Sequence, residues 1–335
     1  MNLALTFYSV LKMPISDIIS CGVAAEKAGF SHVSLAESFY RDAAVLGTAI
    51  ATNTTKIKFG SSIFPIPTRT PFQIAMATAT LNEISCNRVG FVGLGVGYRS
   101  RIEKYFGIKI ENSLDKMKEY VAVLKGLLSG EDYTYRGNFF SFESFPKLVP
   151  YRMNIPILFG SSGPKMIDLA GQISDGLVLN SIGTPDYFKE AICTFQESVK
   201  RSKRKKSKFE IASSVIFSVD DKYDEAIKAA KPDVLFYVLY PELDPVIEKT
   251  PYVERIKKIR KEHSAGNYKE ALSLISDEMI EDLTIAGTPK ECRKKLQKIY
   301  GYGITLPIIR VSVQTFKENQ RKDVFLKAIQ SLAKM

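Results

Sequence analysis

Hydrophobic and polar positions follow two different periods along the chain, and the period changes at short intervals. Residues 2–8 and 89–94 form continuous apolar, β-prone runs that are typical of buried strands. Between such runs the apolar positions recur with helical spacing, as in 15–28, which Gly29 follows, and in 71–84, which begins with proline. This order of strand and helix predicts a parallel sheet with right-handed crossovers.

The alternation predicts eight strands, the number that closes a (β/α)8 barrel, or TIM barrel. A length of 335 residues suits one such barrel with insertions. A doubly wound open sheet remains an alternative, because periodicity does not separate the two architectures. The expected strands are 2–8, 32–36, 56–63, 89–94, 155–159, 177–180, 209–219 and 306–313, and the expected helices are 15–28, 43–52, 71–84, 113–128, 165–173, 185–200, 224–230, 288–300 and 317–332.

Two segments interrupt the alternation. Residues 133–145 are aromatic and polar and contain glycine, which predicts a hairpin or an extended excursion near 130–150. Residues 232–283 contain four prolines and two short amphipathic stretches, so we expect an insertion before the last barrel unit. The expected organisation is therefore one barrel domain over 1–335 that carries these two additions.

Composition narrows the class of protein. The chain is 45% hydrophobic and 25% charged, as globular proteins are. Its four cysteines are widely spaced and it has only two histidines, which argues against a disulfide framework and against a metal centre. No apolar run approaches the roughly 18 residues that a membrane span needs, and the amino terminus reads as a strand. We therefore expect a cytoplasmic, metal-free protein that does not enter membranes.

Seven of the positive charges behind the net charge of +11 lie in residues 200–208. Such a run can bind nucleic acid or the anionic tail of a ligand. No aromatic side chain lies within the run, which argues against a groove for single-stranded nucleic acid. We favour a solvated helix end and expect no nucleic-acid partner.

One motif stands where a strand is expected to lead into a helix. Gly160, Ser161, Ser162, Gly163, Pro164 and Lys165 follow the strand 155–159. Free backbone N–H groups at a helix amino terminus bind anions, and Lys165 would add a full positive charge. An ordinary turn in which Ser162 caps the helix is the alternative interpretation.

Two other strand ends are rich in small residues. Ser61, Ser62 and Ile63 precede two prolines, so this stretch is either an irregular backbone lying against a flat ring or a proline-stiffened loop. The glycines of 93–97 have GxGxG spacing rather than the GxGxxG of dinucleotide-binding loops. Close approach of a ligand and plain tight packing both explain them.

Taken together, the motifs resemble the luciferase-like oxidoreductases over nearly the whole chain except 232–283. The run 160–166, with 169–171 and 174–176, is similar to that of methylenetetrahydromethanopterin reductases. The other matching segments occur in the family's order and are Ala36-Glu37-Ser38, 52–60, Arg69-Thr70-Pro71, 80–85, 87–95 and 285–291.

The resemblance implies a (β/α)8 barrel that binds coenzyme F420, an 8-hydroxy-5-deazaflavin, or FMN. It places the cofactor phosphate on 160–165 and the ring against a bulge at 61–63, with a non-prolyl cis peptide between Ser62 and Ile63. The Gly-Pro-Lys-Met form of the phosphate turn favours F420, and so does the net positive charge of the chain, because the tail of this deazaflavin is polyanionic. The expected reaction is hydride transfer with a small-molecule substrate. An FMN-dependent monooxygenase and a non-catalytic flavin-binding protein are the alternatives, and a homodimer is expected.

The sequence departs from the reductases at the positions that carry their chemistry. Thr6 and Tyr98 stand where those enzymes have carboxylates, and Glu37-Ser38 replaces their acidic residue and histidine. Glu37 is the remaining catalytic candidate, as a proton relay, or else it forms an ion pair with Arg41 or Arg69. Tyr98 is a candidate proton donor or a cover for the cofactor, and Thr6 a hydrogen-bonding neighbour. Substrate and proton donor are left open.

Overall fold

Eight parallel strands close a barrel in the computed structural model, which describes residues 2–8, 12–37, 40–205 and 208–333. Strand β12 pairs with β1, so the wall has no open edge and the doubly wound alternative is wrong. In order around the wall, the strands are β1 (Ala4–Thr6), β2 (His32–Leu35), β3 (Lys58–Ser61), β5 (Val89–Gly95), β8 (Ile157–Gly160), β9 (Gly176–Leu179), β10 (Glu210–Val219) and β12 (Leu306–Val311).

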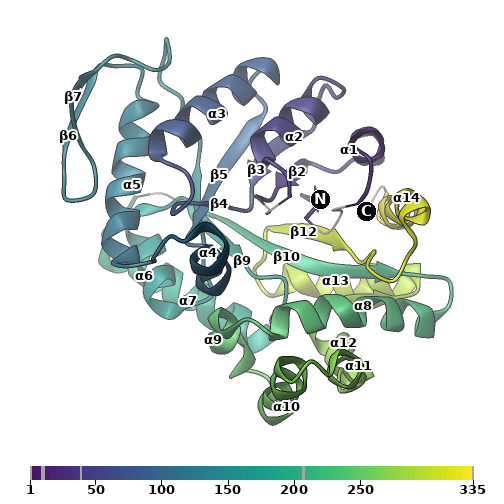
Figure 1. Cartoon of the computed structure of the whole chain (residues 1–335). Helices are drawn as coiled ribbons and strands as arrows, with labels where there is room; N and C mark the ends of the chain where they lie inside the picture. Colours follow the sequence, from purple (N-terminus) through teal and green to yellow (C-terminus); the bar gives the residue numbers. More distant parts are fainter. Residues whose placement is uncertain (1, 9–11, 38–39, 206–207, 334–335) are drawn as a thin grey trace.

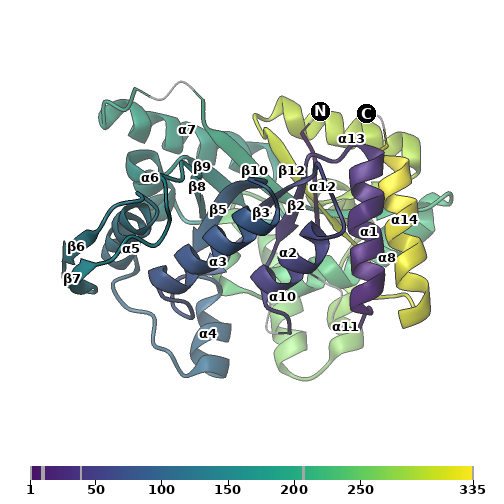
Figure 2. The same ribbon diagram turned by 90° about the horizontal axis from the view of Figure 1, so that it is seen from above.

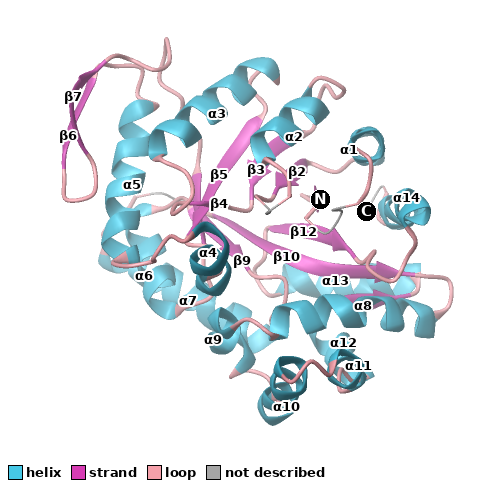
Figure 3. Cartoon of the chain, in the orientation of Figure 1, coloured by secondary structure: helices cyan, strands magenta, loops and turns pink. Residues whose placement is uncertain are grey.

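Helices surround this wall, as Figures 1 and 3 show. Local sequence sets their ends: Gly29 ends α1 in the left-handed conformation with φ 92°, and Thr70 forms a capping box with Gln73 at the start of α3. The helices that correspond to the expected ones are α1 (Ile15–Ala28), α2 (Ala43–Ala51), α3 (Pro71–Ile84), α5 (Ser113–Leu127), α6 (Pro164–Ile173), α7 (Pro185–Arg201), α8 (Tyr223–Val238), α13 (Pro289–Gly301) and α14 (Arg321–Ser331), the last preceded by the 3₁₀ helix η2 (Glu318–Gln320).

The segment expected to be a hairpin or an excursion is an antiparallel hairpin, β6 (Tyr133–Arg136) and β7 (Ser141–Phe145). It lies outside α5 and away from the barrel axis in both views (Figures 1 and 2). Tyr133, Phe142 and Phe145 pack against one another, with ring centroids of Phe142 5.7 Å from Tyr133 and 6.1 Å from Phe145.

Three elements differ from the sequence-based expectation. Helix α8 continues through Pro232 to Val238 because Val234, Leu235 and Val238 are buried, and this packing outweighs the hydrogen bond that proline cannot donate. Helix α4 (Arg99–Phe106) was not expected, since its apolar positions are few. Within the described part of the chain, strand β11 (Ile285–Gly287) pairs only with the end of β10 and stays outside the wall.

The chain between α8 and β11 folds into short helices. They cover one side of α8 (Figure 1). They are η1 (Pro241–Leu243), α9 (Asp244–Ile247), α10 (Val253–Ser264), α11 (Tyr268–Ser273) and α12 (Asp277–Leu283).

The core has two parts. The larger lies between the wall and the helices, and the smaller fills the barrel interior with side chains that include Phe91, Leu158 and Ile308. At the amino-terminal end of β2, burial lowers the pKa of His32 to about 4, so its ring is neutral at pH 7. Side chains therefore fill the interior of the barrel, and a ligand can bind only at the carboxyl ends of the strands.

Candidate functional site

A cavity of about 280 Å³ lies at the carboxyl ends of the strands, where barrel enzymes carry their active sites. Side chains from β1, β9, β10 and β12 meet there with the loops that follow β2, β3, β5 and β8. Four of the candidates, namely Ser61, Gly163, Pro164 and Lys165, do not line it. The candidates that line it are Thr6, Glu37, Ser62, Ile63, Tyr98, Gly160, Ser161 and Ser162.

The wall bulges into this cavity between β3 and the short strand β4 (Phe64–Pro65), which resumes pairing with β5. The bulge consists of Ser62 and Ile63, and the peptide bond between them is cis, as the resemblance implied. Ser62 donates its backbone N–H to Leu35 O at 2.9 Å, and its hydroxyl is hydrogen-bonded to that of Ser34. The expected irregular backbone is present, and it presents Ile63 to the cavity.

Three glycines make room for the bulge. A Cβ on Gly93 would lie 2.0 Å from Ser61 O, and one on Gly95 would lie 2.9 Å from Ile63 Cδ1. A Cβ on Gly160 would lie 2.6 Å from Ile63 Cγ2. The Ser61 hydroxyl also donates to Gly93 O at 3.0 Å, so Ser61 ties β3 to β5 instead of facing the cavity. Gly93 and Gly95 thus serve tight packing rather than ligand approach.

The turn before α6 leaves several backbone donors free. Gly163 is the N-cap with φ −93° and ψ 145°. Of the residues that the structure describes, none caps the helix with its side chain, and none would lie within 4 Å of a Cβ on Gly163. The backbone N–H groups of Ser162, Gly163, Lys165 and Met166 have no hydrogen-bond partner among the described residues. The alternative in which Ser162 caps the helix is therefore wrong, and the turn fits an anion such as a phosphate.

Pro164 and Lys165 face away from the cavity. They border a separate shallow depression with Lys118 and Asp168 on the outer side of α6. The Lys165 ammonium therefore stands beside the turn and not within the cavity itself.

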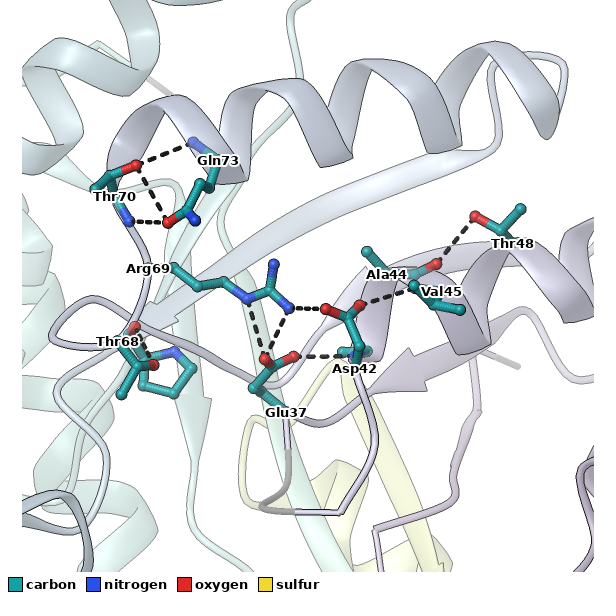
Figure 4. Close-up of polar contacts among 11 residues, drawn as sticks. Glu37, Asp42, Ala44, Val45, Thr48, Thr68, Arg69, Thr70 and Gln73 are labelled. Carbon is teal, nitrogen blue, oxygen red and sulfur yellow. Dashed lines mark hydrogen bonds and ion pairs between the residues drawn. The ribbon is translucent and has the colours of Figure 1, made fainter. Parts of the chain in front are cut away.

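Glu37 is held by an ion-pair network at the rim of the cavity (Figure 4). Its Oε1 accepts from Arg69 Nε at 3.0 Å and from Nη2 at 2.8 Å, and its Oε2 accepts from Ala43 N at 3.0 Å. Arg69 also pairs with Asp42. Burial alone would lower the pKa of Arg69, but the hydrogen bonds to Glu37 and Asp42 raise it above its ordinary value. Both carboxylate oxygens of Glu37 thus accept hydrogen bonds. Of the two arginines expected as its ion-pair partner, Arg69 forms the pair, and Arg41 donates to Met13 O at 2.6 Å. Ser38 lies outside the described residues.

Tyr98 forms one side of the cavity. Its ring stacks on Tyr240 with centroids 4.2 Å apart and an angle of 11° between the planes. Asn180 Nδ2 donates to the Tyr98 hydroxyl at 3.2 Å. Burial raises the pKa of Tyr98 well above its ordinary value, so the hydroxyl stays protonated at physiological pH. This position suits a cover over a bound ring.

The floor of the cavity contains groups that the sequence analysis did not single out. Arg310, only 2% exposed, lines it and pairs with Asp233 Oδ1 at 3.0 Å. Tyr237 accepts a hydrogen bond from Ser181 Oγ at 2.7 Å. The lone charge in the apolar strand 306–311 was a signal for Arg310, because arginine is almost never fully buried without a partner. Nothing in the sequence pattern pointed to Tyr237 or to Glu242, which also lines the cavity.

Thr6 reaches the same cavity from β1. Its Oγ1 is buried and has no hydrogen-bond partner among the described residues. An unpaired buried hydroxyl is costly, so this group fits a ligand that supplies the missing hydrogen bond.

Other features lie outside this cavity. Within the described residues no three His, Cys, Asp or Glu side chains are grouped as a metal site, and no helix has both the length and the apolar character to cross a membrane. In the basic run, Arg201 pairs with Asp168 and Arg204 donates to Gly171 O at 3.1 Å, which joins the end of α7 to α6. Lys206 lies outside the described residues.

Residues 4–306 match the family described as luciferase-like monooxygenase. The 5,10-methylenetetrahydromethanopterin reductase of Methanolobus tindarius is 29% identical over 295 residues, covering 87% of this chain and 89% of the reductase. The structure of the coenzyme F420-dependent tetrahydromethanopterin reductase from Methanopyrus kandleri superposes with a TM-score of 0.82 at 24% identity, over 99% of this chain and 97% of that one. An F420-dependent secondary alcohol dehydrogenase, solved with an F420–acetone adduct, superposes with a TM-score of 0.79 at 22% identity, over 99% and 98% of the two chains. The chain therefore belongs to the luciferase-like monooxygenase family.

Proposed function

We propose that this chain is an oxidoreductase that uses coenzyme F420 to transfer hydride to or from a small organic substrate. The observation that carries the proposal is the turn before α6, with its free N–H groups, beside a cavity walled by the bulge at Ser62 and Ile63. The names of two solved relatives that superpose over 99% of the chain point to the same cofactor. FMN remains the alternative cofactor.

The residues present fit such a cofactor. The N–H groups of residues 162–166 would hold its phosphate, and the Thr6 hydroxyl would complete its hydrogen bonding with a polar atom of the ring. Ile63 would support one face of the ring and Tyr98, stacked on Tyr240, would shield the site from water. When bound, F420 accepts or gives a hydride and, since carbon replaces the reactive ring nitrogen, does not activate oxygen.

The roles of the catalytic candidates follow from their contacts. Glu37 has both oxygens occupied, so we assign it the positioning of Arg69 and of the start of α2 rather than proton transfer. Tyr98 covers the cofactor, and Thr6 binds it. These assignments leave the proton that accompanies a hydride without a donor or acceptor among the three candidates.

Cofactor titration tests the proposal. The purified protein should quench or shift the fluorescence of added F420 with saturable affinity, and FMN should not compete. Gly163→Asp places a carboxylate at the free N–H groups and should abolish F420 binding while the thermal midpoint stays unchanged. Gly163→Ala is the matched control, because a Cβ there meets nothing within 4 Å, and it should bind normally.

Other outcomes would point elsewhere. Unchanged F420 affinity in Gly163→Asp would remove the phosphate site. Tight FMN binding with oxygen consumption would favour the monooxygenase alternative. Cofactor binding without any redox change towards alcohols, pterins or oxygen would favour a non-catalytic flavin-binding protein.

We also propose that the chain acts in the cytoplasm as a homodimer. Helices α2 and α3 pack side by side and expose apolar side chains, with Val45 69%, Met76 50% and Ile84 40% exposed. Such a face favours association with a second copy. Val45→Glu should then shift the protein to the monomer in analytical ultracentrifugation, and a wild type that sediments as a monomer would contradict the proposal.

A further inference from the structure

A second carboxylate, besides that of Glu37, enters the cavity from the segment after α8. Glu242 lies on η1 and lines the cavity, as Tyr98 and Tyr237 also do. Its Oε1 accepts the backbone N–H of Ser100 at 2.9 Å, which links η1 to the first turn of α4. Its Oε2 is buried and has no hydrogen-bond partner among the described residues.

The position of Glu242 is fixed by packing on both sides. Tyr240 stacks on Tyr98, and the adjacent Leu243 is completely buried. Arg260 of α10 donates to Val238 O at 2.7 Å and to Tyr240 O at 3.1 Å, and pairs with Asp244 at 2.7 Å. One oxygen therefore holds the side chain, and this fixes the position of the second, buried oxygen as well; a fixed position is what acid–base catalysis requires.

The carboxylates of Glu37 and Glu242 differ in how many of their oxygens already accept a hydrogen bond. Glu37 uses both oxygens for Arg69 and Ala43. Glu242 keeps one oxygen without a partner, and a carboxylate oxygen that is buried in this way requires a donor or a proton. Because an ionised carboxylate accepts hydrogen bonds and donates none, the group that completes it must carry an O–H or N–H.

We infer that Glu242 is the catalytic acid–base residue of this site and that the substrate is a small alcohol, oxidised to a carbonyl compound, or the same pair in reverse. The inference rests on the proposed deazaflavin function. The substrate O–H bond breaks and its proton moves to Glu242 Oε2. The adjacent C–H bond breaks with its electron pair, which goes as hydride to the deazaflavin, and the carbon–oxygen double bond forms. In the reverse direction Glu242 returns the proton to the oxygen.

A binding experiment without turnover tests the inference. With oxidised F420 bound, tert-butyl alcohol offers a hydroxyl but no hydride, and acetone offers only an acceptor, so neither reacts. In Glu242→Gln the amide oxygen still accepts from Ser100, and the amide NH2 replaces the free carboxylate oxygen. The ratio of the affinity for the alcohol to that for the ketone, measured by calorimetry or F420 fluorescence, should fall about tenfold. Glu248→Gln removes the same charge from an exposed position six residues away and should leave the ratio unchanged.

Turnover provides the second measurement. Against a panel of small primary and secondary alcohols, Glu242→Gln should lower kcat roughly 100-fold or more with the F420 dissociation constant within about twofold of wild type. Formate added to Glu242→Ala should restore part of the rate, since a small carboxylate can occupy the vacated position.

Each remaining outcome overturns a defined part of the inference. Normal affinity ratio and normal kcat in Glu242→Gln, with lowered thermal stability only in Glu242→Ala, would reduce Glu242 to a cap of α4. A wild type that binds F420 but neither binds nor oxidises any alcohol would refute the substrate class and leave the cofactor proposal intact. Failure to bind F420 would refute the proposed function and the inference with it.

Discussion

Replacing Gly160 with alanine should destabilise the barrel through one contact, that with Ile63. The added Cβ would lie 2.6 Å from Ile63 Cγ2, whereas carbon atoms prefer roughly 3.5–4.0 Å, so one of the two must move by about 1 Å. Ile63 is β-branched and has little rotamer freedom. Overpacking of this kind costs about 1–3 kcal/mol, and we expect a loss in that range.

A double-mutant cycle isolates this contact. Ile63→Ala removes the atom that the new Cβ would meet, so Gly160→Ala should cost only a few tenths of a kcal/mol in that background, a coupling of about 1–3 kcal/mol. The free energies come from urea unfolding of the four proteins. Gly163→Ala in the same turn is the control for the chemical change itself, because its Cβ has no neighbour within 4 Å. An equal cost of Gly160→Ala in both backgrounds would refute the argument that Ile63 sets the need for glycine.

Three further predictions concern individual side chains. Thr6→Val removes a buried hydroxyl without a partner among the described residues and keeps the shape of the side chain, so the apoprotein should be as stable as wild type or more stable. Its F420 affinity should fall roughly threefold to tenfold in fluorescence titration. Unchanged affinity would show that Thr6 does not bind the ring. Tyr98→Phe keeps the stack on Tyr240 and should retain both cofactor binding and turnover, whereas a large loss of kcat would restore Tyr98 as the proton donor. Burial alone would raise the pKa of Glu26, but hydrogen bonds from the N–H groups of residues 55–57 lower it below its ordinary value. Glu26 therefore stabilises the fold at pH values above its unfolded-state pKa. This contribution is lost as the pH falls through the lower folded-state pKa. Urea unfolding of Glu26→Gln should therefore show reduced stability at neutral pH and a difference from wild type that closes below about pH 4, and a gap independent of pH would contradict this account.

The elements of the barrel were predictable because their signals are local. The helices at 15–28 and 71–84 have the bounds that apolar spacing, Gly29 and the proline at the helix start predicted. The number of strands in the wall also followed from the alternation of periods. Where prediction failed, tertiary packing decided: α8 passes through Pro232 because its later residues are buried.

What the sequence by itself determined is the sequence of strands and helices, the family, and the turn at 160–165, since each depends on residues close together along the chain. Only the tertiary structure decided the partners of the polar side chains: Arg69 reaches Glu37 from 32 residues away, and Ser100 reaches Glu242 from 142 residues away. It also assigned Gly93 and Gly95 to packing, because the bulge they accommodate comes from a neighbouring strand. The physical reason is that hydrophobic periodicity depends only on residues that are close together in the sequence. The protonation and hydrogen bonding of a site depend instead on which strand ends and loops lie next to one another in space.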